Sequence, residues 1–247
     1  MLINSKYEHL REWLERLPEE FERLGEVIYD KRNQLRVITA PDGTLVNVKR
    51  YCKTHLVNRV VYSLGIRQAK GLRAFLYPTR LLERGIDTPE PIAYIEQRSC
   101  GLLGLSYFVS VQSSLKHTLY EFGDAKEGTY EEIAEALGRF TATMHDREVL
   151  HLDYSPGNIL WDKDDEGYHF AVVDINRMRF GKVNMEDGCA ALRRLWGPKR
   201  FIELIARSYA RARGFDEEEA VRLTMQARTA FWTRYSRRHP VEFELEL

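Results

Sequence analysis

The spacing of the apolar residues changes near Gln112, from a strand-like to a helix-like period. From Gly25 onward, runs rich in Val, Ile, Thr and Tyr alternate apolar and polar residues, and turn signals such as "PDG" separate them. After Gln112 the apolar residues recur at spacings of three and four, which is typical of helices that bury one face. The pattern predicts an α+β protein with a strand-rich front lobe and a mostly helical back lobe.

Three segments follow from this pattern. Residues 1–24 are predicted to form an amphipathic helix whose apolar face carries Leu10, Trp13, Leu14, Leu17 and Phe21. Residues 25–111 are expected to form a five-stranded antiparallel lobe, with a helix over residues 67–84, and residues 112–247 to form the helical lobe. The amphipathic helix is expected to pack on its own domain, with membrane-surface binding as the alternative.

Composition excludes several classes of protein. Lys plus Arg and Asp plus Glu number 37 each, so the overall charge gives no reason to expect nucleic-acid binding. The three cysteines are far apart and form no C-x-x-C pair, which argues against a disulfide framework or a zinc knuckle. No run approaches the ~18 apolar residues of a membrane span, and the first residues lack an apolar signal core. We expect a cytoplasmic protein that is soluble or at most peripheral to the membrane.

The stretch "HLDYSPGN" carries the most chemical information. His151, Asp153 and Asn158 stand at the spacing of the protein-kinase catalytic loop. Phosphoryl transfer needs a carboxylate to orient the attacking hydroxyl and an oxygen ligand for magnesium close by. The Ser-Pro-Gly turn between the two residues would let Asp153 and Asn158 face one site. Asp153 is therefore the candidate catalytic residue, and Asn158 a candidate metal ligand.

Two further residues complete the pattern. Asp174 ends the apolar run "FAVVD", sixteen residues after Asn158, and an intervening hairpin would bring it beside Asn158 as a second Mg²⁺ ligand. Lys49 ends "VNVK", the counterpart of the V-A-I-K strand whose lysine binds the α- and β-phosphates of ATP. The order of these features predicts a protein-kinase-like bilobal fold that uses ATP and Mg²⁺.

Three runs carry a resemblance to a known family. "LERGIDTPEPIAYIE", "LDYSPGNIL" and "VDINRMRFG" resemble the Kdo/heptose lipopolysaccharide kinases, from about Val27 to the closing helices. The resemblance implies an ATP-dependent kinase of lipopolysaccharide biosynthesis. Its acceptor would be a sugar or glycolipid, phosphorylated on a hydroxyl of a Kdo- or heptose-containing inner-core intermediate at the cytoplasmic face of the membrane. It also implies that Lys49 contacts the nucleotide, that Asp153 is catalytic, and that Asn158 and Asp174 bind the metal.

The nucleotide side departs from the protein-kinase pattern. The loop "YDKRNQ" has no glycine, so the side chains of Lys31, Arg32 and Asn33 are candidate phosphate donors, with an ordinary charged hairpin tip as the alternative. Gln112, just after the last strand of the front lobe, is the candidate hinge residue against adenine.

The expected acidic partner of Lys49 is missing, because residues 50–82 contain no Asp or Glu. Leu76 stands where the family glutamate would align, and Glu83 is the nearest acid. A catalytically weak pseudokinase or scaffold is therefore one alternative. A kinase of another small-molecule acceptor is a second. The segment after Asp174 is too short to hold a peptide, which favours a small acceptor.

The same acid-free segment has a local charge of +7. Residues 50–82 could contact an anionic membrane or phosphorylated sugars, or they could form a solvated face balanced by acids elsewhere. The basic residues are Arg50, Lys53, Arg59, Arg67, Lys70, Arg73 and Arg80. His145 and His151 are expected to brace the catalytic loop through backbone hydrogen bonds. The sequence leaves the oligomeric state open.

Overall fold

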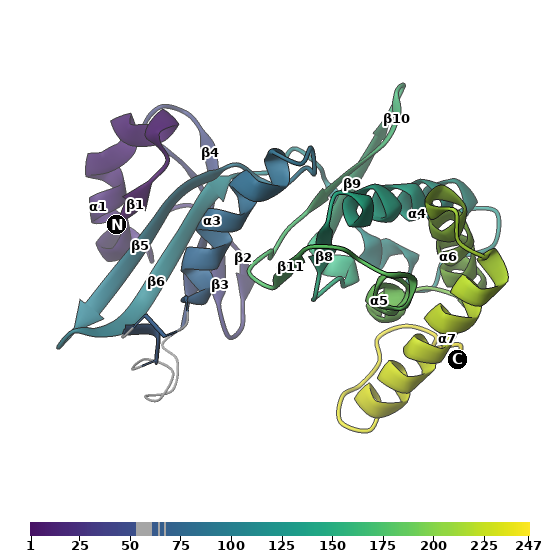
Figure 1. The fold of residues 1–247 in the computed structure, drawn as a ribbon. Coiled ribbons are helices and arrows are strands. Elements are labelled where there is room, and N and C mark those ends of the chain that lie inside the picture. The colour runs from purple at the N-terminus through teal and green to yellow at the C-terminus, as the bar shows by residue number, and fades with distance from the viewer. Residues whose placement is uncertain (53–60, 64, 67) are drawn as a thin grey trace. The chain divides into compact units, whose positions relative to one another are not determined.

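The computed structural model describes residues 1–52, 61–63, 65–66 and 68–247. The chain divides into two compact units (Figure 1). The first comprises Met1–Glu83 and Thr88–Ser114, and the second comprises Arg84–Asp87 and Leu115–Leu247. Each unit has its own cluster of buried apolar side chains, so each is described by itself.

The first unit is built on an antiparallel sheet of six strands in its described residues, in the order β1-β5-β6-β4-β3-β2. The prediction of five strands was one short. The additional strand pairs Leu2 with Tyr94 at the edge beyond β5, and two residues are too few to show a strand period in the sequence. The strands are β1 (Leu2–Ile3), β2 (Glu26–Asp30), β3 (Gln34–Thr39), β4 (Leu45–Tyr51), β5 (Pro91–Ser99) and β6 (Leu102–Val111).

Helices lie on both faces of this sheet, as Figure 1 shows. A 3-10 helix (Ser5–Leu10) leads into α1 (Arg11–Glu20), and all five residues predicted for the apolar face are buried in one cluster with strand residues such as Val46 and Val48. The amphipathic helix therefore packs on its own unit, as expected. On the opposite face, α3 (Lys70–Leu82) approaches so closely that a Cβ on Gly71 would lie 2.6 Å from the Tyr94 ring.

The second unit is mostly helical, as predicted. Gly214 ends α6 in the left-handed conformation, and the Asp216 carboxylate caps α7 by accepting from the backbone N–H of Glu219 at 2.7 Å. The α-helices are α4 (Glu131–Asp146), α5 (Met185–Ala191), α6 (Lys199–Arg213) and α7 (Glu217–Tyr235), and the 3-10 helices are Leu119–Phe122, Pro156–Asn158 and Leu192–Arg194.

Two small sheets frame the predicted catalytic loop. One contains β10 (Gly167–Val172), β9 (Ile159–Asp164) and β7 (His117–Thr118), and the other pairs β8 (Val149–His151) with β11 (Met178–Phe180). The loop of interest, residues 152–158, runs from the end of β8 to the start of β9. Among the described residues, no helix has the length and apolar content needed to cross a membrane.

Candidate active site

The predicted catalytic loop, residues 152–158, is fixed by a buried histidine. The backbone N–H of Asp153 donates to Nδ1 of His151 at 3.0 Å, which leaves the proton on Nε2, and Nε2 donates to the carbonyl of Val173 at 3.1 Å. The ring is 1% exposed, and this burial lowers the pKa of His151 and favours the neutral form that these two bonds need. His151 therefore braces the loop as predicted, and it ties Asp153 to the segment that leads to Asp174.

His145 does not share this role. Its Nδ1 lies 3.1 Å from the hydroxyl of Tyr209 on α6, and no backbone group of the catalytic loop is among its hydrogen-bond partners. The prediction that both histidines brace the loop is therefore wrong for His145, because the helix face that carries it turns toward α6.

Asn158 and Asp174 lie beside each other through the β9–β10 hairpin. Ile159 pairs with Val172, and the backbone N–H of Val173 donates to the carbonyl of Asn158 at 3.0 Å. The amide group of Asn158 donates to the carbonyl of Asp153 at 2.9 Å, which leaves its amide oxygen as the acceptor. The hairpin predicted from "ILWDKDDEGYHFAVV" is confirmed, and it brings the two predicted metal ligands together with the Asp153 backbone.

Asp174 has an unusual backbone conformation. Its φ of +52° lies in the left-handed region, which costs a non-glycine residue about 1 kcal/mol or more. The amide of the buried Asn176 donates to its carboxylate. The strain is held between the β9–β10 hairpin and the β8–β11 pair, and a strained acidic residue between two fixed pairs of strands is common at functional sites.

Sequence reasoning missed two arginines that contact the carboxylate of Asp153. Nη1 of Arg177 lies 3.3 Å from Oδ2, and Nη1 of Arg194 contacts Oδ1. Arg177 stands three residues after Asp174 in "DINR", so its closeness to the site could have been inferred. Arg194, in "LRRLW", carries no motif, and only the fold brings it to Asp153.

Lys49 lies in the first unit, on β4. It stands opposite Leu35 and Phe108 on the neighbouring strands, and Phe108 stands opposite Tyr94, whose ring contacts α3. Residues directly opposite in neighbouring strands share a face of the sheet, so Lys49 is on the α3 side. Its ammonium lies 5.3 Å from the Tyr51 ring centroid.

The buried face of α3 offers Lys49 no carboxylate. The α3 residues that are buried are Gly71, Ala74, Pro78 and Leu81. Leu76, where the glutamate was expected to align, is 37% exposed and outside this set. Glu83 is the exposed C-cap of the helix.

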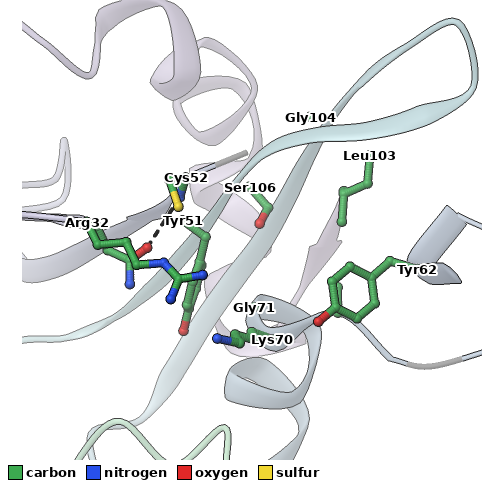
Figure 2. Close-up of a pocket in the computed structure, with 11 residues that line it drawn as sticks. Arg32, Tyr51, Cys52, Tyr62, Lys70, Gly71, Leu103, Gly104 and Ser106 are labelled. Carbon is green, nitrogen blue, oxygen red and sulfur yellow. Dashed lines mark hydrogen bonds between the residues drawn. The ribbon is translucent and has the colours of Figure 1, made fainter. Parts of the chain in front are cut away.

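The Lys31–Asn33 turn joins β2 to β3. The backbone N–H of Lys31 donates to the carbonyl of Asn33 at 3.3 Å, and the side-chain oxygen of Asn33 accepts from the backbone N–H of Cys52 at 3.3 Å. Figure 2 shows the pocket beside this turn, lined by Arg32, Asn33 and residues including Tyr51 and Lys70. As the described residues shape it, the pocket holds about 60 Å³, far below the ~300 Å³ or more of a small-molecule site.

Gln112 directly follows β6, where a hinge residue was predicted. Its backbone N–H donates to the carbonyl of Leu45 at 2.9 Å, and its side-chain oxygen accepts from the amide of Asn47 at 3.0 Å. Asn47 shares its face of β4 with Lys49, two residues away. The end of β6 is thus anchored to β4, next to the row that carries Lys49.

The predicted basic surface is only partly described. Lys53, Arg59 and Arg67 lie outside the described residues. Arg50 contacts the carboxylate of Glu22 and donates to the side-chain oxygen of Gln34 at 2.9 Å, so its charge is already paired within the first unit.

Within the second unit, the fold gathers His151, Asp153, Asn158 and Asp174 around one loop. The first unit carries Lys49, Gln112 and the Lys31–Asn33 turn. With this geometry established, comparison with known proteins decides the family: the family model described as "Lipopolysaccharide kinase (Kdo/WaaP) family" matches residues 22–196.

This chain belongs to the lipopolysaccharide kinase (Kdo/WaaP) family. The family resemblance of the three sequence runs is thereby confirmed, and it makes the chain a member of a kinase, hence phosphotransferase, family. No protein with a curated annotation matches the sequence.

Solved structures support the fold of this lipopolysaccharide kinase family member. A structure titled "WaaP in complex with acyl carrier protein" aligns with a TM-score of 0.59 and 20% identity, over 94% of this chain and 96% of that one. The amicoumacin kinase hAmiN, solved with AMP-PNP, Ca²⁺ and Ami, aligns with a TM-score of 0.57 and 11% identity, over 97% and 92%. At these identities the likeness establishes the fold alone, and it confirms the predicted kinase-like fold.

Proposed function

We propose that this kinase family member transfers the γ-phosphoryl group of ATP, in a Mg²⁺-dependent reaction, to a sugar hydroxyl of a Kdo- or heptose-containing lipopolysaccharide inner-core intermediate. The observation that carries the proposal is the position of Asn158, inside the region matched by the family model: its amide donates to the carbonyl of Asp153, and its carbonyl accepts from Val173, the residue before Asp174. The acceptor would be a sugar or glycolipid presented at the cytoplasmic face of the membrane.

Asp153 would orient the acceptor hydroxyl and accept its proton as the new P–O bond forms. The bond from its backbone N–H to His151 fixes the loop on one side, and the bond from its carbonyl to the Asn158 amide fixes it on the other. The Asp153 side chain is 21% exposed, so an acceptor can reach it.

Asn158 and Asp174 would hold Mg²⁺. They fit the ion, because amide and carboxylate oxygens are the ligands Mg²⁺ prefers, and the Asn158 amide N–H₂ already bonds to Asp153 and leaves the oxygen as the ligand atom. When bound, the ion supplies charge neutralisation on the transferring phosphate. Among the described residues no cluster of three or more His, Cys, Asp or Glu forms a closed metal cage, which is consistent with an ion whose remaining ligands are phosphate and water oxygens.

Lys49 would bind the nucleotide phosphates, with Lys31, Arg32 and Asn33 contributing donors from the β2–β3 turn. Gln112 would contact adenine at the end of β6. Because the buried face of α3 carries no carboxylate, Lys49 would be positioned by the sheet row of Leu35 and Phe108 rather than by a helix glutamate.

The missing glutamate is also the observation that favours the alternative, a pseudokinase that binds nucleotide without turnover. A purified-protein assay separates the two: phosphate transfer from [γ-³²P]ATP to Kdo- and heptose-containing lipid acceptors, run beside thermal-shift titration with MgATP. Binding without transfer to any acceptor would favour the pseudokinase. Transfer to unrelated small molecules at equal efficiency would favour a different acceptor class.

The same assay tests the residue roles. Asp153→Asn keeps the shape of the side chain and removes the base, so the transfer rate should fall by ~10²–10⁴-fold while MgATP still shifts the melting temperature. Asp165→Asn, at the exposed tip of the β9–β10 hairpin, is the matched control and should retain the wild-type rate. Full phosphoryl transfer by Asp153→Asn would overturn the assignment.

A further inference from the structure

Two arginines from separate elements reach the Asp153 carboxylate, one at each oxygen. Arg177 comes from the segment before β11, and Arg194 ends the 3-10 helix Leu192–Arg194. The Arg177 side chain is 55% exposed and that of Arg194 is 29% exposed. Both guanidinium groups therefore stand where an acceptor approaching Asp153 can contact them.

A third cation lies beside them. Burial, and then the like charges of Arg194 and Arg177, lower the pKa of Arg193, so this residue lies within electrostatic range of both. Its Nη1 donates to the carbonyl of Ala190. The contacts place two guanidinium groups, those of Arg177 and Arg194, on one carboxylate, and Arg193 is the residue next to Arg194 in the chain. Positive charge exceeds negative charge in this cluster, which favours the binding of a further anion.

The cluster is held in place by neighbouring structure. The guanidinium of Arg194 lies 5.4 Å from the centroid of the Phe231 ring on α7. Fully buried Arg228, also on α7, donates to the carbonyls of Leu195 and Gly197 at 2.6 and 2.9 Å. These bonds anchor the chain directly after Arg194, so the cationic cluster is part of the fixed framework of the second unit.

We propose that Arg177 and Arg194, assisted by Arg193, bind an oxyanion of the acceptor beside the hydroxyl that Asp153 orients, and so select an acidic sugar over a neutral one. A guanidinium offers five N–H donors in a planar fork that matches a carboxylate or a phosphate, and the Asp153 contact uses one nitrogen of each arginine. The inference rests on the proposed function and adds the charge of the acceptor and the residues that read it.

The test compares acceptors that differ only in charge. A Kdo glycoside is assayed against its carboxamide, and a phosphorylated heptose against the unphosphorylated sugar, with wild type, Arg194→Gln and Arg177→Gln. We expect wild type to prefer the charged member of at least one pair. Arg194→Gln should raise KM for that member by about tenfold or more, because it loses a charge-assisted hydrogen bond, with KM for ATP unchanged. The preferred pair identifies whether the anion is a carboxylate or a phosphate.

Two further variants sharpen the result. Arg194→Lys keeps the charge without the fork and should recover part of the preference. Arg200→Gln removes the same charge from an exposed α6 residue that pairs with Glu203, and should leave all parameters at wild-type values. Equal loss for charged and neutral acceptors, or a raised KM for ATP, would overturn the proposal and assign the arginines to the transferring phosphate or to positioning Asp153.

Calorimetric titration of the same sugars without ATP separates this inference from the proposed function. If the acidic sugar binds wild type and not Arg194→Gln while no transfer occurs, the anion site stands and the kinase assignment fails. If wild type and Arg194→Gln bind the acidic sugar equally, the anion site is wrong whatever the activity.

Discussion

The two units differ in how tightly each holds its candidate residues. In the second unit, the loop from His151 to Asn158 is fixed by side-chain and backbone hydrogen bonds within the loop and to Val173 and Arg177, in the segment between β10 and β11. In the first unit, the bonds that hold the Lys31–Asn33 turn among the described residues are one backbone bond within the turn, the Asn33 contact to Cys52 and the Asp30–Gln34 pair at its base, and every residue of β2 is exposed. The local structure of this family member is therefore fixed by more hydrogen bonds around Asp153 than at the turn where nucleotide phosphates are expected.

The largest expected effect is on the phosphoryl-transfer rate, compared between Asp174→Asn in the second unit and Lys49→Met in the first. We expect Asp174→Asn to lower the phosphoryl-transfer rate by ~10³-fold or more, because a charge at the proposed metal site is lost, and Lys49→Met to lower it by ~10²-fold, because it removes one of several proposed donors to the nucleotide phosphates. Single-turnover rates at saturating MgATP measure both. A loss of rate with Lys49→Met as large as that with Asp174→Asn would contradict the expected difference between the two units.

Glu83→Gln supplies the control for Lys49. Glu83 is the exposed C-cap of α3, outside the buried face that meets the sheet, so its loss should leave the rate and KM for ATP at wild-type values. A Glu83→Gln defect that matches Lys49→Met would instead identify Glu83 as the acidic partner.

A smaller effect is expected when a methyl group is added at matched glycines of the two units. At Gly71 the new Cβ would lie 2.6 Å from the ring of Tyr94, which is 2% exposed and so cannot turn out into solvent without leaving the core. The clash should cost ~1–3 kcal/mol, which exceeds the gain in helix propensity of at most ~1 kcal/mol. Gly71→Ala should therefore lower the free energy of unfolding in urea titration.

A Cβ on Gly157 would also meet a tyrosine ring, but one that is partly exposed to solvent. The Cβ would lie 2.6 Å from the Tyr120 ring, but Tyr120 is 48% exposed, so this ring has solvent on one side where the Tyr94 ring has protein. Gly157→Ala should change the free energy of unfolding by less than ~1 kcal/mol. Equal destabilisation by the two alanines would show that Tyr120 is as confined as Tyr94.

A further effect concerns pH and the core of the second unit. Burial lowers the pKa of His145 to about 3 from its usual 6.5. Between those values the unfolded chain binds a proton that the folded chain does not, so His145 makes the free energy of unfolding fall by up to ~1.4 kcal/mol per unit of acidification, beginning below about pH 6.5.

His145→Gln should lower the slope of the free energy of unfolding against pH by the contribution of one proton, and the contributions of other groups should remain. Urea titrations at several pH values between 4 and 7 give this slope for wild type and for His145→Gln. The two slopes should differ by the contribution of roughly one bound proton. Parallel slopes for wild type and His145→Gln would show that His145 titrates normally in the folded protein.

Local patterns in the sequence were sufficient for the fold and for part of the site. The spacing from His151 to Asn158 and the hairpin before Asp174 are encoded within thirty residues, so the sequence indicates both their chemistry and their proximity. The apolar face of α1 is equally local. In contrast, β1 was missed because two residues carry no period, and its pairing with β5 depends on a segment ninety residues away.

The arginines at Asp153 show more clearly what the sequence alone could not predict. Arg194 is forty-one residues from Asp153 and lies in no motif, so only the fold of α5 and the 3-10 helix after it brings the two together. The prediction for His145 was wrong for a related reason. Helical spacing shows which face of the helix a residue is on, but not which element that face packs against. Contacts between elements distant in sequence are decided by tertiary structure.

The left-handed backbone of Asp174 has an evolutionary consequence. Asparagine is, after glycine, among the residues that adopt this conformation most readily, so the exchange of aspartate for asparagine there removes a charge without disturbing the chain path. With the proposed role of Asp174 as a metal ligand, one substitution would give a folded but inactive descendant of this protein, and gene duplicates could lose activity without passing through an unstable intermediate.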